Sequence, residues 1–268
     1  DVNLIADKNT THGNPQPLTI GGSENGTKVN MTNVNISAVA GYGIITFVKT
    51  ELNATGCTIG GYNALYVKPG SEESVFNFND CDLTGSTTSN DVEGNSFSTI
   101  AVRADDVTVN VDADSTVSAT GNYCWAISLE SKYTDENGIT GANITVAGAI
   151  NGKVLTSADV SKNTITVKAE YADELRSAGY GAVIANGMAT AVAPVAKIGT
   201  TGYATLAEAV AAAKDNDTVT LLTDVTINEL IKIEKAITLD LGGKKVTATS
   251  KKAFEVYANA TIKNGTIE

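Results

Sequence analysis

The chain has 268 residues, of which 42% are hydrophobic but only 6% aromatic, and its formal net charge is −11 at pH 7. This length is enough for one elongated domain or two smaller ones with an aliphatic core. Arg103 and Arg176 are the only arginines of this acidic chain. Nucleic-acid binding is not expected, because phosphate contacts need clustered cations. No apolar run approaches the roughly 20 residues of a membrane span, so no membrane span is expected either.

The first residues already match a later stretch of the chain. Residues 1–6 (D-V-N-L-I-A) align with residues 33–38 (N-V-N-I-S-A). We therefore expect the chain to begin part-way through a repeat, with no cap before it. The sequence starts at Asp1 and contains neither an initiator methionine nor a signal peptide, so we expect a mature or fragmentary chain.

A seven-residue frame begins at residues 31–37 (M-T-N-V-N-I-S) and returns at 54–60, 78–84 and 262–268. Its first position is mostly apolar, its fourth is small or apolar and its sixth is aliphatic. The positions between them are mostly Asn, Thr, Asp and Gly. Short alternating stretches separated by turn residues predict strands. Strands that recur about every 20 to 30 residues predict a solenoid.

A second set of apolar–polar–apolar strands lies between the copies of the frame, at 18–20, 45–48, 65–67, 100–102 and 127–129. Each passes through a turn into a strand that carries the frame. Inward side chains of like kind would then stack coil upon coil, with Asn, Gly and Asp at bends that need a positive φ. The pattern predicts an all-β protein, a right-handed parallel β-helix (solenoid) with one short capping α-helix.

The three cysteines are expected to be reduced and buried. Cys57 and Cys81 stand 24 residues apart in the same column of the repeat. A disulfide between them is the open alternative, since adjacent coils lie about 4.8 Å apart, within disulfide reach. The chain has no C-x₂-C pair and a single histidine, so we expect neither a metal site nor a cofactor.

Two polar stretches, 85–98 and 132–141, predict loops that leave the solenoid. Alternating strands resume at 99–117, 142–149 and 163–169. Residues 172–178 predict one or two helical turns that help to close this end. Residues 1–180 are thus expected to form a β-helix body that lacks its N-terminal cap.

Residues 181–202 are predicted to be a linker, with a hinge at 197–202 (K-I-G-T-T-G). A helix follows, with Thr205 as its N-cap and Glu208 three residues later in a capping box. Its apolar residues recur at helical spacing, and seven short strands come after it. Because solenoids usually cover an open end with an amphipathic segment, residues 203–268 are expected to be the helix-capped start of a β-helix module.

Residues 194–228 resemble the module opening of pectate-lyase-like β-helix repeat proteins, which are adhesin-like surface proteins of gut bacteria. The resemblance covers about 35 residues, in P-V-A-K-I-G-T-T-G-Y-A-T-L-A-E-A-V and the strands after it. It implies an extracellular, wall-associated and non-catalytic solenoid at the cell surface. It carries no catalytic residue onto this chain.

The alternative from another class is a polysaccharide lyase or hydrolase, because the β-helix fold is shared by enzymes and inert proteins. Arg103 followed by Asp105 and Asp106 is the candidate cluster, since a paired carboxylate can hold a metal or act in acid–base catalysis. A solvated turn between two strands explains these residues more simply. His12 lacks the G-H-G context of polygalacturonases. We therefore expect that the protein is not an enzyme.

A third hypothesis is a glycan-binding module that contacts cell-wall or host sugars. Its candidate stacking residues lie at similar bends of the repeat: Tyr42, Tyr62, Tyr123 and Trp125. Aromatic rings along a solenoid can stack on sugars, but they can equally pad a corner between turns.

The two ends of the repeat suggest self-association. The frame at 262–268 is in phase with the frame at 31–37, so the C-terminal piece of one subunit could complete the N-terminal end of the next. Such a head-to-tail contact does not close and would make a filament. The candidate assembly residues are Val2, Leu4, Leu18 and Ile20 at one end, and Phe254, Val256, Ile262 and Ile267 at the other. The alternatives are a tandem array of modules, or two pieces that fold against each other within one chain.

Overall fold

The structure is a computed structural model that describes residues 2–6, 15–22, 26–39, 41–87, 98–130, 138–156 and 158–268. The chain divides into two compact units. Unit 1 comprises Asp1–Tyr171 and Ala185–Thr190, and unit 2 comprises Ala172–Ile184 and Ala191–Glu268. Each unit has its own set of buried aliphatic side chains.

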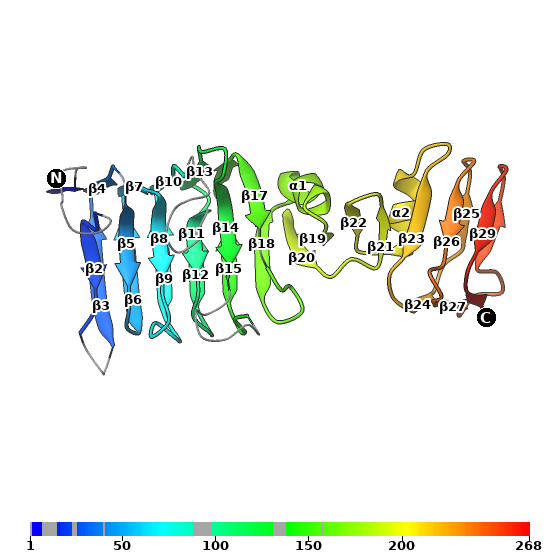
Figure 1. Cartoon of the computed structure of the whole chain (residues 1–268), viewed down its shortest axis with the longest axis horizontal. Helices are drawn as coiled ribbons and strands as arrows, with labels where there is room; N and C mark the ends of the chain where they lie inside the picture. Colours follow the sequence, from blue (N-terminus) through cyan, green and yellow to red (C-terminus); the bar gives the residue numbers. More distant parts are fainter. Residues whose placement is uncertain are drawn as a thin grey trace. The chain divides into compact units, whose positions relative to one another are not determined.

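The strands of unit 1 pass in turn to three parallel sheets, so that each strand pairs with the one three places further along the chain (Figure 1). Sheet A contains β1 (Val2–Ala6), β4 (Val34–Ala38), β7 (Thr58–Gly61), β10 (Asp82–Gly85), β13 (Thr116–Ala119) and β16 (Ala149–Asn151). Sheet B contains β2 (Leu18–Ile20), β5 (Tyr42–Thr46), β8 (Asn63–Val67), β11 (Ser98–Val102), β14 (Trp125–Leu129) and β17 (Lys153–Thr156). Sheet C contains β3 (Thr27–Thr32), β6 (Thr50–Thr55), β9 (Val75–Asn79), β12 (Thr108–Val111), β15 (Asn143–Val146) and β18 (Thr164–Lys168). This arrangement is a parallel β-helix, which confirms the predicted fold class.

The seven-residue frame of the sequence is the corner between sheet C and sheet A. Its sixth positions, Ile36, Ile59 and Leu83, lie opposite one another in β4, β7 and β10 and are buried. Its first positions lie opposite one another in β3, β6 and β9. The match of the first residues with a later stretch is also confirmed, because β1 pairs with β4 from Val2 opposite Val34 onward.

The corner itself needs a left-handed backbone. Asn33, Gly56 and Asp80 occupy it in successive coils, with φ of 54°, 63° and 52°. These are the residue types that adopt a positive φ at the lowest cost. Cys57 and Cys81 follow the last two of these residues, which explains why they recur in one column.

Asparagine side chains form a ladder along the outer face of sheet C. The Nδ2 atoms of Asn53, Asn77 and Asn110 donate to the Oδ1 atoms of Asn30, Asn53 and Asn77, at 3.1, 2.9 and 2.9 Å. Each amide therefore donates toward the first coil. On sheet A, Asn35 donates to Asn3 in the same direction, at 3.2 Å.

Residues 181–202, expected to be a linker, contain four strands: β19 (Gly181–Ala185), β20 (Met188–Val192), β21 (Ala196–Ile198) and β22 (Thr201–Tyr203). Asn186 and Gly187 connect β19 to β20, both with positive φ, and β20 adds antiparallel to β18. The residues of the expected hinge lie in a hairpin, in which Gly199 and Thr200 form a two-residue turn between β21 and β22. Asn-Gly between apolar runs is a strong hairpin signal that a linker assignment overlooks.

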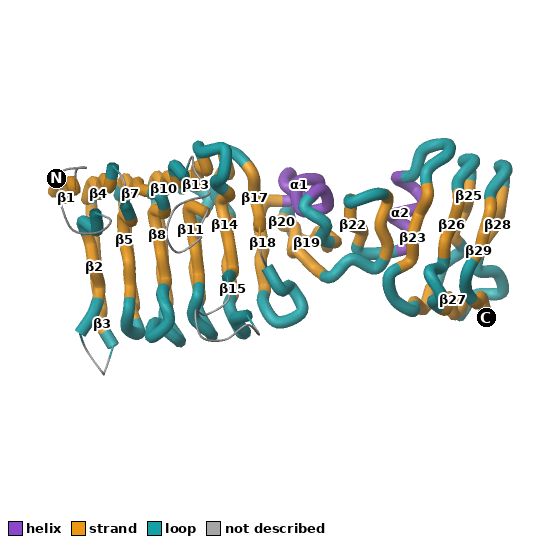
Figure 2. The backbone as a smooth tube through the Cα atoms, in the orientation of Figure 1, coloured by secondary structure: helices purple, strands orange, loops and turns teal. Residues whose placement is uncertain are grey.

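Unit 2 contains a second three-faced parallel solenoid (Figure 2). Sheet D continues β22 and β21 with β23 (Thr218–Leu221), β26 (Thr238–Asp240) and β29 (Thr261–Lys263). Sheet E contains β24 (Val225–Ile227), β27 (Lys245–Ala248) and β30 (Thr266–Ile267), and sheet F contains β25 (Ile231–Ile233) and β28 (Phe254–Val256). The helical elements described are short: the 3-10 turn η1 (Ala169–Tyr171), α1 (Ala172–Ser177) and α2 (Leu206–Ala212).

Helix α2 packs against the first coil of this second solenoid. Its buried residues Leu206, Ala209 and Val210 belong to the same core cluster as the inward side chains of β23, β25 and β26. Thr205 is the N-cap as predicted, because its Oγ1 accepts the backbone N–H of Glu208 at 3.1 Å. Among the described residues, the side chain of Glu208 does not accept the backbone N–H of Thr205, so the second hydrogen bond of the predicted capping box is absent. Glu208 instead lines a cavity beside α1, where its Oε2 is buried without a partner.

Candidate functional site

Among the residues that the structure describes, no strand stacks on the inward-facing apolar side chains of the first coil of unit 1. Strands β1, β2 and β3 each lie at the end of their sheet. The assembly residues expected at this end are on this coil: Val2 and Leu4 in β1, Leu18 and Ile20 in β2. Val2 is 55% exposed and Leu4 and Leu18 are half-buried, although Ile36 and Ile44, opposite Leu4 and Leu18, are fully buried. Ile20 is buried.

The last coil of unit 2 has the same character. Strands β28, β29 and β30 each lie at the end of their sheet, and they carry the other expected assembly residues. Val256, Ile262 and Ile267 are 48%, 36% and 43% exposed, and Phe254 is half-buried. Their partners in the preceding coil are buried, as Leu239 opposite Ile262 illustrates. These side chains continue the inner columns of the solenoid, and no other described residue stacks on them.

The same left-handed corner occurs in both solenoids, and the chain passes through their faces in the same order. Asn264 joins β29 to β30 with a φ of 58°, just as Asn33 joins β3 to β4 with a φ of 54°. Sheet D therefore corresponds to sheet C, sheet E to sheet A and sheet F to sheet B. Strands visit the corresponding sheets in the same cyclic order in both units. The last coil of unit 2 and the first coil of unit 1 thus each expose one strand of every corresponding sheet.

The aromatic residues considered for glycan stacking are divided between two places. Tyr42 is only 5% exposed, and its ring centroid lies 4.9 Å from that of Tyr66. Tyr62 is half-buried and packs against the same cluster. Rings in such a cluster contribute to packing on the outer face of sheet B, where β5, β8 and β11 are buried along their whole length.

The other two aromatic residues lie at the start of β14. Tyr123 is 43% exposed, whereas Trp125 is half-buried and has the Nζ atom of Lys153 4.6 Å from its ring centroid. The structure therefore does not bring the four residues into one exposed column.

The arginine of the lyase hypothesis has a partner that the sequence reasoning did not name. Arg103 is buried and pairs with Glu130, while Asp105 accepts the backbone N–H of Thr140 at 3.0 Å. Asp106 is exposed and occupies the turn between β11 and β12 with a φ of 55°. The sequence analysis did not identify Glu130 as the partner of Arg103, although the strand pattern contained the information. The predicted strands at 100–102 and 127–129 pair in register, which places the next residue of each strand side by side.

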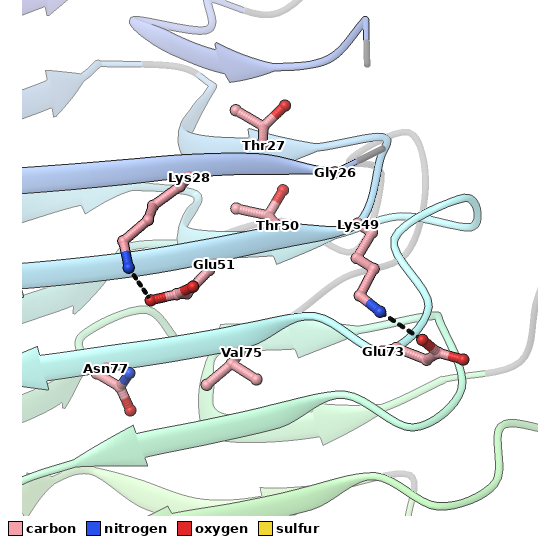
Figure 3. A pocket seen from close by; sticks show the side chains of 9 residues that line it. All are labelled: Gly26, Thr27, Lys28, Lys49, Thr50, Glu51, Glu73, Val75 and Asn77. Atoms are coloured by element: carbon pink, nitrogen blue, oxygen red, sulfur yellow. Dashed lines mark hydrogen bonds and ion pairs between the residues drawn. The ribbon is translucent and has the colours of Figure 1, made fainter. Parts of the chain in front are cut away.

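A shallow groove on the outer face of sheet C contains two ion pairs (Figure 3). Lys28 contacts Glu51 at 2.6 Å and Lys49 contacts Glu73 at 2.5 Å, each across neighbouring coils. The hydrogen bonds from these lysines lower the pKa of both carboxyl groups. All four side chains are solvent-exposed, so each pair adds little stability and keeps the charges of this face in balance.

The three cysteines are buried free thiols, as expected, and no disulfide joins Cys57 to Cys81. The Sγ atom of Cys81 lies 3.4 Å from the backbone nitrogen of Cys57 in the adjacent coil. Burial raises the pKa of Cys81 to about 11 and also raises the pKa of Cys124. Such thiols are structural and unreactive at neutral pH.

No group of three or more potential metal ligands occurs among the residues that the structure describes. His12 lies outside the described residues. In the part of the chain described, no helix has the length and apolar character needed to span a bilayer.

The sheet order defines the class of the protein, which is a parallel β-helix protein with two solenoid units. Comparisons with protein-family models, curated proteins and solved structures found no match.

Proposed function

We propose that this protein is an extracellular, adhesin-like structural protein without catalytic activity, whose subunits join end to end into a filament. The observation that carries this proposal is that β1 to β3 and β28 to β30 are end strands on corresponding faces of the two solenoids, with partly exposed inward apolar side chains. The extracellular location and the adhesin-like class rest on the resemblance of residues 194–228 to surface β-helix repeats.

The uncovered coils supply both kinds of interaction that hold a solenoid together. On one side of these strands no described strand pairs with the backbone, so another parallel strand can add there. Their inward apolar side chains would gain about 1.5–3 kcal/mol each on full burial. Because association costs about 4–15 kcal/mol, the several side chains at each end can balance this cost, and assembly should depend on protein concentration.

The charges of the two units favour the same contact. Residues 1–171 contain 19 acidic and 9 basic side chains, whereas residues 172–268 contain 11 and 10. Of the five lysines in the last turns of unit 2, Lys245, Lys252 and Lys263 form ion pairs with Glu268, Glu255 and Asp240. Lys244 and Lys251 add further positive charge to this end. Contact of this end with the acidic unit is therefore electrostatically better than contact between two acidic units.

The test is negative-stain microscopy together with sedimentation velocity over a range of concentrations. We expect filaments for the unmodified chain and none for Ile262→Asp, because a carboxylate would face the inner column of the joint. Thr261→Asp is the matched control on the outer face of the same strand, and it should still assemble. Monodisperse short particles for the unmodified chain at high concentration would reject the proposal.

A further inference from the structure

We propose that strand β1 blocks assembly, because it occupies the place beside β4 that β30 of a second copy of this chain takes in the filament. The inference rests on the proposed end-to-end assembly and adds the strand replacement that controls it. In the structure, β1 pairs with β4 along its whole length, from Val2 opposite Val34 to Ala6 opposite Ala38. A second copy joins only after β1 has left this place.

The path of the chain through the left-handed corner leads β30 to β4. A corner residue stacks on the corner of the next coil, as Asn33 does on Gly56, with φ of 54° and 63°. Asn264 has a φ of 58°, so it stacks on Asn33 of the second copy when β29 pairs with β3. β30 then lies beside β4. Ile267 is opposite Ile36, because each follows its corner by the same number of residues.

Leu4 of β1 holds this position within one chain, because it pairs with Ile36. If β1 stayed, β30 could stack only on β1. The strands β29 and β3 would then be two coil spacings apart, about 9.6 Å, with no strand between them. A joint with β1 in place therefore forms one strand pair on these two faces, whereas the replacement forms two pairs and a continuous corner.

The backbone groups of β29 and β3 are in phase for this pairing. In a parallel ladder, alternate residues direct their N–H and C=O groups to opposite sides. The N–H of Thr261 donates to the preceding coil at 3.0 Å, so the groups of Ile262 face the open end. The N–H of Thr27 donates to the second coil at 2.8 Å, so the groups of Asn30 and Thr32 face the open end of β3. Ile262 can therefore donate to Asn30 and accept from Thr32.

Strand β30 offers β4 the same kind of contact as β1 does. The N–H of Thr266 donates to the preceding coil at 3.2 Å, so the groups of Ile267 face the second copy. Thr266 then lies beside Asn35, whose Nδ2 donates to Asn3 Oδ1 at 3.2 Å while β1 is in place. The hydroxyl of Thr266 can accept the same amide proton, so the replacement preserves this polar contact.

Strand β1 is enclosed on one side only, since it ends its sheet. Val2 and Ile5 are 55% and 66% exposed, and Leu4 is half-buried. The replacement exchanges this single strand pair for two. Because copies join only while β4 is free, their apparent affinity is reduced by the fraction of chains in which β1 is absent from it.

The first test is the direction in which Leu4→Asp changes assembly. The carboxylate would face the column of Ile36 and release β1. Filaments should therefore form at a roughly tenfold lower protein concentration than for the unmodified chain, measured by sedimentation. Ile5→Asp, on the outer face of the same strand, is the matched control and should leave this concentration unchanged. If β30 stacked on β1 instead, Leu4→Asp would suppress filaments, and that result would overturn the proposal.

The second test locks β1 in place. In Asn3→Cys/Asn35→Cys the two thiols lie on adjacent coils, about 4.8 Å apart and within disulfide reach. The oxidised variant should form no filaments, and reduction should restore them. Asn77→Cys/Asn110→Cys joins β9 to β12 in the same way and should assemble in both redox states. Equal assembly of the two oxidised variants would show that β1 does not block the joint.

The third test detects the replacement itself by cross-linking between copies. Oxidised Asn35→Cys/Thr266→Cys should give disulfide-linked multimers on non-reducing gels, because β30 lies beside β4. Multimers of Asn3→Cys/Thr266→Cys alone would place β30 on β1, which refutes the replacement but leaves the proposed function standing. Absence of filaments in the unmodified chain and in every variant, Leu4→Asp included, would remove the proposed function and this inference with it.

Discussion

At the scale of single residues, the outer asparagine ladder is as regular as the inner apolar columns. Asn77 is half-buried and sits in the middle of the ladder, where its amide both donates and accepts. A net hydrogen bond contributes roughly 0.5–1.5 kcal/mol. Asn77→Ala should therefore lower the free energy of unfolding by about 1–3 kcal/mol, measured by urea denaturation. Asn110→Ala, at the exposed end of the ladder, should cost about half as much, and equal losses would contradict the ladder.

The buried thiol of Cys81 predicts a pH dependence of stability. Its pKa rises from 9.0 to about 11, chiefly through burial, so the folded state favours the protonated thiol. This contribution is fully present below pH 9 and is lost as the pH rises toward 11, by at most about 1.4 kcal/mol per pH unit. Urea denaturation of the unmodified chain and of Cys81→Ala should show the smaller pH slope in the variant. Parallel profiles between pH 8.5 and pH 11 would refute this assignment.

At the scale of elements, the corner between sheets C and A depends on backbone conformation more than on side-chain contacts. Asp80 is exposed, has a φ of 52° and occupies the same corner as Gly56. Asp80→Gly should leave the melting temperature nearly unchanged or raise it. Asp80→Val should cost about 1–2 kcal/mol, because a β-branched residue is strained in the left-handed region. The comparison is made by thermal denaturation, and equal stability of the two variants would show that the corner does not control folding.

The elements also show how far sequence reasoning reaches. The apolar columns were predictable because inward residues repeat at fixed positions, as Ile36, Ile59 and Leu83 do. The hairpin at residues 196–203 was missed, because glycine and threonine in a short turn resemble a flexible linker until a partner strand is known. The burial of Tyr42 was not predictable either. It depends on what covers the outer face of sheet B, and no local pattern encodes that.

At the scale of the whole molecule, the two units should unfold separately, because each has its own core. Leu239→Ala in unit 2 should cost about 2–5 kcal/mol and lower the temperature of one calorimetric transition. Leu65→Ala, at an equally buried position in unit 1, should lower the other. A single transition that shifts in both variants would argue against independent units.

The register between coils has one more consequence, for how such a protein can change its length. Glu51 lies opposite Val75, so a chain without residues 51–74 would connect Thr50 to a residue that occupies the same place one turn later. Loss or duplication of such a stretch of DNA would remove or add a complete layer and leave both terminal surfaces as they are. Length can therefore vary during evolution without any change in the first or the last coil.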